Sequence, residues 1–350
     1  MKFIHIADVH LGLVTDPGCS WSRQWTEDRM ATFRSVLDVC NQDQIDLLLI
    51  SGDLFHQIPT VAELKEVDYL FSTLTHTYVV LIAGNHDPNT PDSPYQDFTW
   101  CKQVIFLRKP TFASAYFPHL NTEVCGFSYD RIEIPEARCQ NVRPGTKGRH
   151  QILLLHGGDA SHVPFRVRDL HSKGFDYIAL GHIHQPSQWP EQCAAYAGSL
   201  EPTDQNDTGA RGYIRGEITD EGTTFSFVPA SRHEYRQLRL NLTPEITQTA
   251  VEDQLRRLLA ERMNCVFRIL LEGSTDPVAP IDPDRLKLLG HIIRVEDHTT
   301  PAYDLAILRR EHAGDVIGRF LASFPEEGLS PVESKALYYG LSALLKGESK

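Results

Sequence analysis

Short apolar runs recur through the first 230 residues of this 350-residue chain, and helical patterns separate them. Each run is rich in Ile, Leu or Val and has the length of a buried strand. The runs lie at 3–7, 45–51, 78–83, 151–155 and 177–180. Residues 27–41 place apolar side chains on one helical face, and residues 60–74 begin with a capping box of Thr60 and Glu63. The pattern predicts a layered α/β domain with a central sheet, completed by later strands within 194–228.

The pattern changes near Arg232, where a smaller α/β module is predicted to begin. Residues 235–242, 265–271 and 292–296 have strand patterns, whereas 251–262 and 284–289 have helical ones. After Pro301 the pattern is helical, with an apolar stripe along 303–324 and a last helix that opens with Ser330, Pro331 and Glu333. We therefore predict three parts, residues 1–232, 233–300 and 301–350.

Composition limits the classes of protein that the chain can represent. Its net charge is −12, and the first 230 residues hold 18 basic and 28 acidic side chains. This balance disfavours a protein that grips nucleic acid unaided, although contact through bound metal remains open. The seven cysteines are scattered and form no CxxC pair, which favours a reducing compartment over disulfides or a cysteine-held zinc. No apolar run approaches the roughly 20 residues that span a bilayer, and we see no secretory signal, so we expect a cytoplasmic protein without a membrane partner.

Polar residues with metal-binding chemistry follow the apolar runs of the first domain. They occur in ADVHLG, SGDLFH, GNHD, LLLHG and LGHIH. Each residue alone has an ordinary structural explanation as a turn former or a satisfied histidine. Together they favour a metal site, because loops beyond the carboxyl ends of strands converge on one crevice of an open α/β sheet. Residues two apart in a strand point the same way, so His182 and His184 could reach into one space. Imidazole and oxygen donors without thiolates suit Mn, Fe or Zn.

The ordered motifs DxH, GDxxH, GNHD, H and GHxH resemble the calcineurin-like metallophosphoesterase superfamily over residue 1 to about 228. More narrowly, ADVHLG, GDLFH and FDYIALGHIHQP followed by YAGSL resemble the SbcD-type DNA repair exonucleases, and among them a short bacterial branch called YhaO-like. The resemblance implies a four-layer fold, in which two packed mixed sheets are flanked by helices. It also implies that residues 233–300 form a small α/β capping module and residues 301–350 a helical tail.

The same resemblance implies two divalent ions, with manganese favoured and iron or zinc possible. The first ion is expected at Asp8, His10, Asp53 and His184. The second is expected at Asp53, Asn85, His156 and His182, so that Asp53 bridges the pair. A bridging hydroxide would attack phosphorus.

The family also implies roles for three residues that are not metal ligands. His86 is expected to protonate or stabilise the leaving oxygen, and Asp87 to orient the His86 ring. His56 is expected near the substrate phosphate. Asp159, Ser199 and Arg211 could approach the site, but the sequence assigns them no role.

Three functions are compatible with these residues. The first is the DNA nuclease subunit of an SbcCD-like repair complex, whose capping module limits what DNA enters and whose tail docks on an SMC-like ATPase. In this function a homodimer is implied, formed through the helix after the loop 11–26, where Trp21 and Trp25 are expected to be exposed or folded onto the site mouth. The second is a stand-alone small-molecule phosphodiesterase or pyrophosphohydrolase, which leaves the last 120 residues unexplained. The third is a non-catalytic scaffold, disfavoured because no ligand position is lost. The tail could also pack back on the catalytic domain.

Overall fold

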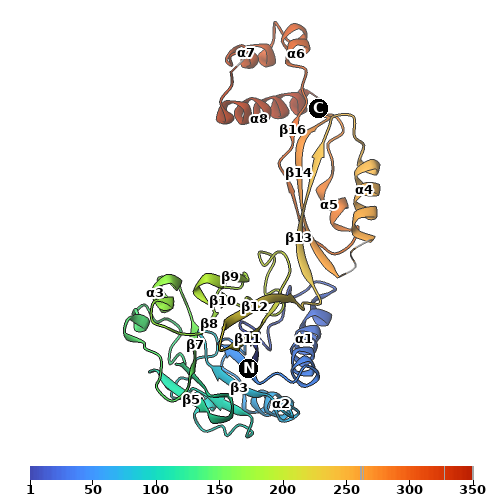
Figure 1. Cartoon of the computed structure of the whole chain (residues 1–350). Helices are drawn as coiled ribbons and strands as arrows, with labels where there is room; N and C mark the ends of the chain where they lie inside the picture. The colour runs from blue at the N-terminus through green and yellow to red at the C-terminus, as the bar shows by residue number, and fades with distance from the viewer. Residues whose placement is uncertain (261, 263, 327, 349–350) are drawn as a thin grey trace. The chain divides into compact units, whose positions relative to one another are not determined.

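The computed structural model describes residues 1–260, 262, 264–326 and 328–348, and the chain divides into two compact units, 1–235 and 236–350 (Figure 1). The predicted helix 251–262 includes residue 261, and the predicted segment 301–350 includes residues 327, 349 and 350. These four positions lie outside the described residues. Within the described part of the chain, none of the helices combines the length and apolar character needed to cross a bilayer.

The first sheet of unit 1 has the strand order β12-β11-β1-β2-β3-β4. The strands β1 to β4 are parallel, and β11 and β12 add an antiparallel edge. Their bounds are Lys2–Ile6 (β1), Leu47–Ser51 (β2), Tyr78–Ile82 (β3), Val104–Phe106 (β4), Gly212–Thr219 (β11) and Gly222–Pro229 (β12). Successive side chains alternate between faces, so Ile4 and Ile6 join the core under the helices α1 (Ser22–Gln42) and α2 (Val61–Ser72), while Phe3 and Ala7 join the opposite core.

The second sheet has the order β5-β6-β7-β8-β10-β9, in which β6, β7, β8 and β10 are parallel. Its strands are Ala113–Phe117 (β5), Thr122–Gly126 (β6), His150–His156 (β7), Tyr177–Gly181 (β8), Ser187–Trp189 (β9) and Ala194–Tyr196 (β10). Ile152 and Leu154 of β7 pack against the first sheet, whereas Leu153 and Leu155 pack under α3 (Val167–His171) and nearby loops. Short 3₁₀ turns occupy Pro94–Gln96, Pro118–Leu120, Arg138–Asn141 and Pro190–Gln192. Two sheets packed together and covered on their outer faces confirm the predicted four-layer fold.

The hydrophobic pattern alone predicted one central sheet, and this was wrong. Three of the five apolar runs lie in the first sheet and two in the second. Buried strands of both sheets have the same continuous apolar character, because each contacts apolar layers on both faces. Their partition is therefore decided by pairing, which local sequence does not encode.

The start of the first helix also differs from the prediction. The helix α1 begins at Ser22, so it includes part of CSWSRQW, and Trp21 and Trp25 are buried rather than exposed. Trp25 stacks on His233 at a ring-centroid distance of 4.4 Å, and Trp21 Nε1 donates to Asp16 Oδ2 at 2.7 Å. The capping box of α2 is present as predicted, with Thr60 N donating to Glu63 at 2.7 Å.

Unit 2 contains a smaller sheet with the order β13-β14-β15, and β16 pairs with β14. The strands are Glu234–Leu242 (β13), Cys265–Thr275 (β14), Ile292–Asp297 (β15) and Thr300–Pro301 (β16). The helices α4 (Gln248–Ala260) and α5 (Pro283–Lys287) pack on it through Val251, Leu255 and Leu286 (Figure 1).

Three helices follow, α6 (Leu305–Glu311), α7 (Val316–Ala322) and α8 (Pro331–Glu348). The apolar stripe along 303–324 is therefore divided between two helices rather than carried by one. Asp315 ends the first pattern and starts the second, because its carboxylate caps the amides of Ile317 and Gly318. Ile317 and Leu321 of α7 pack against Leu337 and Leu341 of α8 and form a separate small core.

Candidate metal centre

The predicted ligands come together where the carboxyl ends of the two sheets' parallel strands meet. Asp8 and His10 follow β1, Asp53 follows β2 and Asn85 follows β3 in the first sheet. In the second sheet His156 ends β7, and His182 and His184 follow β8. The first five of these side chains are buried, and the two histidines of the HxH motif are partly exposed. Segments up to 174 residues apart thus supply one cluster.

The donor atoms form two groups on either side of Asp53. His10 Nε2 lies 3.2 Å from His184 Nε2 and 3.8 Å from Asp53 Oδ2. On the other side, Asn85 Oδ1 lies 2.8 Å from His156 Nε2 and 3.1 Å from His182 Nδ1, and His156 Nε2 is 3.3 Å from Asp53 Oδ2. One carboxylate oxygen therefore faces both groups, as a bridging ligand does.

Asp8 lies close to both groups of donor atoms. It forms one set of possible ligands with His10 and His184 and another with Asp53 and His156, and within each set the ligand atoms lie within 4.8 Å of one another. The His182 amide donates to both Asp8 oxygens at 3.0 Å and so orients the carboxylate. Nitrogen and oxygen donors converge here without sulfur, and this donor set fits divalent Mn, Fe or Zn.

The charges of the buried groups are strongly coupled. Burial raises the pKa of Asp8 to about 6. Burial acts in the same direction on Asp53, but the adjacent His156 holds the pKa of that carboxyl well below its usual range. Burial lowers the pKa of His156, and Asp53 more than reverses this and raises it to about 9. A cation that binds His156 Nε2 must therefore displace a proton from a buried imidazolium–carboxylate pair.

Four of these residues have backbone conformations that side chains seldom adopt. The φ angles are +50° at Asp8, +50° at His10, +51° at Asp53 and +96° at His182. Positive φ is uncommon outside glycine, although Asp and His tolerate it better than most residues, and such positions cluster at functional sites. Gly84 of GNHD is required for a different reason, since a Cβ there would overlap the Asp53 carboxylate. The motifs therefore specify backbone geometry as well as ligands.

His56 and His86 lie at the edge of this cluster. Their rings stack with centroids 5.2 Å apart, and His86 packs edge-on against His10 with centroids 4.8 Å apart. His86 is exposed, its amide donates to Asp53 Oδ1 at 2.9 Å, and its Nδ1 lies 3.2 Å from the His56 carbonyl. The backbone of His56 thus orients the His86 ring through Nδ1.

The structure corrects the role predicted for Asp87. Its buried carboxylate accepts hydrogen bonds from the Gly84 amide at 2.8 Å, the Phe55 amide at 3.1 Å and the Tyr95 hydroxyl at 3.0 Å. Burial and the charge of Asp53 raise the pKa of Asp87 to about 7, against these donors. Asp87 therefore joins the GDLFH and GNHD loops instead of orienting the His86 ring.

Arg29 is a residue that the helical pattern did not single out. It projects from α1, is only 2% exposed, and donates to the carbonyls of Val9 and Pro202 at 3.2 and 2.7 Å. It also donates to Thr15 Oγ1 at 3.1 Å. Val9 lies between Asp8 and His10, so this guanidinium supports the turn that carries both. The available signal was its spacing, because Arg29 lies one helical turn from both Trp25 and Phe33, which are buried on α1.

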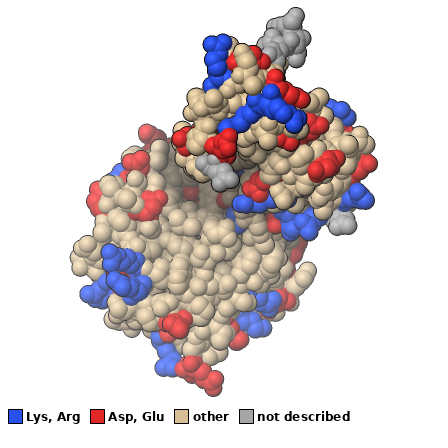
Figure 2. Space-filling view, turned by 90° about the horizontal axis from the view of Figure 1, so that it is seen from above, with Lys and Arg blue, Asp and Glu red and all other residues tan. Residues whose placement is uncertain are grey.

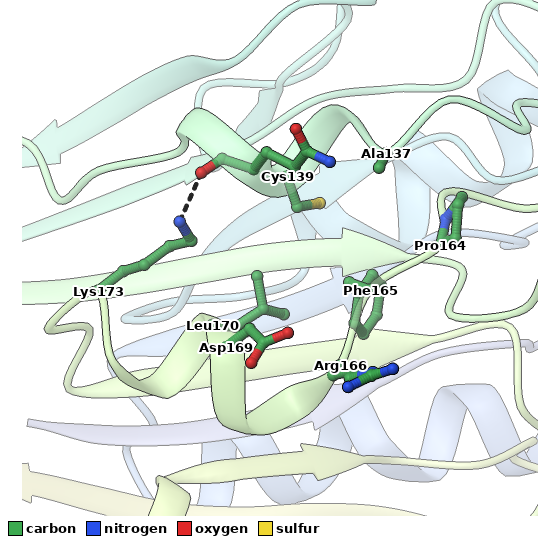
Figure 3. Close-up of a pocket in the computed structure, with 9 residues that line it drawn as sticks. Ala137, Cys139, Pro164, Phe165, Arg166, Asp169, Leu170 and Lys173 are labelled. Atoms are coloured by element: carbon green, nitrogen blue, oxygen red, sulfur yellow. Dashed lines mark hydrogen bonds between the residues drawn. The ribbon is translucent and has the colours of Figure 1, made fainter.

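A separate surface pocket of about 450 Å³ lies on the outer side of the second sheet (Figure 3). Phe165, Leu170 and Cys139 give it apolar walls, and Lys173 Nζ donates to the Gln140 carbonyl at 2.6 Å. Its lining contains none of the residues that the motifs predicted. The candidate metal site is therefore identified by its clustered donor atoms and not by this pocket.

The fold and this donor set define a metallophosphoesterase. Residues 1–186 match the family of calcineurin-like phosphoesterases, and the chain belongs to this family. The predicted superfamily is thereby confirmed. The family uses divalent metals, in agreement with the clustered His and Asp side chains, and it indicates a metal-dependent hydrolase.

Similarity to another protein named as a metallophosphoesterase extends over most of the chain. The uncharacterized metallophosphoesterase YhaO of Bacillus subtilis (strain 168) is 27% identical over 299 residues, which cover 78% of this chain and 72% of the relative. The similarity therefore extends beyond the residues that the family match covers.

Proposed function

We propose that this protein is a two-metal phosphodiesterase that acts on DNA as the nuclease subunit of an SbcCD-like repair complex. The observation that carries the two-metal part of the proposal is the position of Asp53 Oδ2, 3.8 Å from His10 Nε2 and 3.3 Å from His156 Nε2. Two ions sharing this carboxylate would supply the positive charge that stabilises attacking and leaving oxygens of a phosphodiester. Manganese is the ion that the resemblance favours.

The remaining side chains have distinct roles in this proposal. The His56 carbonyl orients His86, and in its protonated form the His86 ring can pass the Nε2 proton to the leaving oxygen. The His56 ring stacks beside it and is placed to contact the substrate phosphate. Asp87 keeps the two loops that carry these histidines in register through the Phe55 and Gly84 amides.

The presence of unit 2 favours a large substrate or a partner protein. It adds residues 236–350 to a catalytic unit that already contains every predicted ligand. We propose that its sheet module limits which DNA reaches the site and that its helical tail, α6 to α8, docks on an SMC-like ATPase. The alternative is that the tail packs back on the catalytic domain and binds no ATPase.

The charge distribution explains why a partner is included in the proposal. The net charge is −12, and Lys and Arg side chains on the face seen in Figure 2 lie in separate groups among Asp and Glu. Phosphate binding needs clustered positive charge, so the ATPase would contribute much of the affinity for DNA. Weak binding of duplex DNA by the isolated protein at physiological salt is the expected consequence.

A homodimer remains part of the proposal because the SbcD-type resemblance implies it. Trp21 and Trp25 are buried within unit 1, so they do not form the surface of the dimer interface. The test is the mass of the purified protein in solution by light scattering. A monomer at every accessible concentration would remove the dimer from the proposal.

The second candidate is a small-molecule phosphodiesterase or pyrophosphohydrolase with the same site. It is supported by the same donor geometry but assigns no role to unit 2. The two functions differ in substrate size and in the need for a partner, so one set of assays separates them.

The test uses the full chain with Mn²⁺ on linear duplex DNA, a DNA hairpin and a bis-aryl phosphodiester, with and without the ATPase. We expect cleavage of DNA, and a large loss of activity in His86→Ala. His76→Ala is the matched control, because His76 is a partly exposed histidine that pairs with Asp46, which is not among the predicted site residues. Cleavage of the aryl ester alone, even with the ATPase present, would contradict the nuclease function. Unchanged activity in His86→Ala would remove the proton-donor role.

A further inference from the structure

The two histidines of the HxH motif contact different carboxylates through their outer ring nitrogens. His182 Nε2 lies 2.7 Å from Asp159 Oδ2, and its Nδ1 faces Asn85 Oδ1 at 3.1 Å. His184 has the reverse orientation, with Nδ1 3.2 Å from Asp207 Oδ2 and Nε2 3.2 Å from His10 Nε2. The two rings therefore present opposite nitrogens to the donor cluster.

The chemistry of the outer contacts assigns the ring protons. An ionised carboxylate only accepts hydrogen bonds, so His182 carries its proton on Nε2 and His184 carries its proton on Nδ1. Thr203 strengthens the second assignment, because its hydroxyl donates to Asp207 Oδ2 at 2.6 Å and its oxygen is then free to accept from His184 Nδ1 at 2.9 Å. Lone pairs are left on His182 Nδ1 and His184 Nε2, the two atoms that face the cluster.

Both carboxylates are themselves held in place. Asp159 Oδ1 accepts the Ser161 and His162 amides at 2.8 and 2.9 Å, so a turn in its own loop fixes it. Asp207 lies beside the buried guanidinium of Arg211, 3.4 Å away, and accepts the Thr203 amide at 2.9 Å. Neither carboxylate depends on its histidine for its position.

We propose that Asp159 and Asp207 are positioning residues, which set the tautomers of His182 and His184 and so assign one imidazole to each of two metal ions. Outer carboxylates of this kind raise the basicity of a metal-binding imidazole and fix its orientation. The inference rests on the two-ion site of the proposed function. Because only one residue separates the two histidines of HxH, a single segment then supplies one ligand to each ion.

The exposure of the two carboxylates predicts unequal effects. The Asp159 side chain is 46% exposed and the Asp207 side chain is 13% exposed. Loss of an outer partner typically weakens metal binding about 10- to 100-fold. Water can replace an exposed partner more readily, so we expect about 10-fold for Asp159→Asn and closer to 100-fold for Asp207→Asn.

The experiment counts and titrates Mn²⁺ on the metal-stripped full chain, by elemental analysis after dialysis and by calorimetry. The wild type should bind two ions, and each Asn variant should weaken one site and leave the other unchanged. Asp169→Asn is the matched control, because Asp169 is exposed and its ion pair is with the neighbouring Arg168. The thermal midpoint of the metal-free variants should stay near that of the wild type, which a merely structural role would lower.

Double variants identify which site each carboxylate serves. Asp159→Asn should add nothing in a His182→Ala background and its full effect in a His184→Ala background, and Asp207→Asn should show the opposite pattern. If Asp207→Asn does not fold, Thr203→Val removes the second acceptor of His184 and should weaken the same site selectively.

Several outcomes would overturn the inference. One is equal weakening of both sites by either Asn variant, and another is wild-type affinity in both variants. Three ions per chain would mean that Asp159, His162 and His182 bind an ion themselves, so that His182 Nε2 is a ligand rather than a donor. Fewer than two ions in the wild type would remove the two-ion site and this inference together. Absence of DNA cleavage with the selective pattern intact would reject the nuclease function alone.

Discussion

Replacing Arg29 with methionine tests whether a buried cation on α1 supports the metal-binding turn. Methionine fills a similar volume, but it removes the donors that Arg29 directs to Val9, Pro202 and Thr15. Burial lowers the pKa of Arg29 only to about 10, so the guanidinium remains charged at neutral pH. The nearby Glu201 carboxylate would lose this compensating charge.

The magnitude follows from the contacts that are lost. Breaking a buried charged network by removing one partner costs about 3 to 5 kcal/mol. For a unit of 235 residues, each kcal/mol shifts the thermal midpoint by about 2 to 4 °C, so Arg29→Met should lower that midpoint by roughly 6 to 20 °C. Mn²⁺ affinity should fall as well, because the Val9 carbonyl lies between Asp8 and His10.

The assay is thermal unfolding of the metal-free protein, followed by Mn²⁺ titration. Arg34→Met is the matched control, since Arg34 lies on the same helix, is half-exposed and pairs with the half-exposed Glu66. An exposed ion pair contributes at most about 1 kcal/mol. Equal midpoints for the two variants would refute the role given to Arg29. A destabilised Arg29 variant with wild-type Mn²⁺ affinity would confine that role to the fold.

Three further predictions concern the loops and the buried core. Gly84→Ala should abolish high-affinity Mn²⁺ binding, because its Cβ would displace the Asp53 carboxylate; normal affinity by calorimetry would contradict this. Above pH 7, where the Asp87 carboxyl is ionised, Asp87→Asn should lower stability by about 1.5 to 3 kcal/mol in urea unfolding, through the lost bond to the Gly84 amide, with exposed Asp92→Asn as the unaffected control. Burial lowers the pKa of His5 to about 3, so the folded state keeps it neutral while the unfolded chain protonates near pH 6.5. The contribution of neutral His5 to the free energy of unfolding is thus complete above pH 6.5. Below that pH it declines toward pH 3 by up to about 1.4 kcal/mol per pH unit. His5→Gln should flatten this slope in urea unfolding measured from pH 7 to pH 4, and an unchanged slope would show that other groups cause it.

The chemistry of the centre could be predicted from sequence because its signal is local. Asp8, His10 and Asp53 directly follow strands whose apolar character is visible in a few residues, and parallel strands of one sheet expose their carboxyl ends at one edge. The capping box of Thr60 and Glu63 was predictable for the same reason, since both residues lie within one helical turn.

Roles that depend on distant partners could not be predicted in this way. Asp87 stands next to His86 in the sequence, yet its carboxylate faces the amide of Phe55, 32 residues earlier. Trp21 and Trp25 have the sequence context of an exposed loop, and only the packing of Trp25 against His233 shows that this segment is covered. Adjacency along the chain gave the wrong partner for Asp87, and for the two tryptophans it left open an exposed position that the structure excludes.

The sequence by itself determined the class of site, because residue types and their spacing after buried strands specify which donor atoms are available. Tertiary structure decided which strands share a sheet and which nitrogen of His182 and His184 faces the cluster. The physical reason is that hydrophobic periodicity is a property of neighbouring residues. The orientation of an imidazole depends on the acceptor at its other nitrogen, and here Asp159 and Asp207 each lie 23 residues from the histidine they contact.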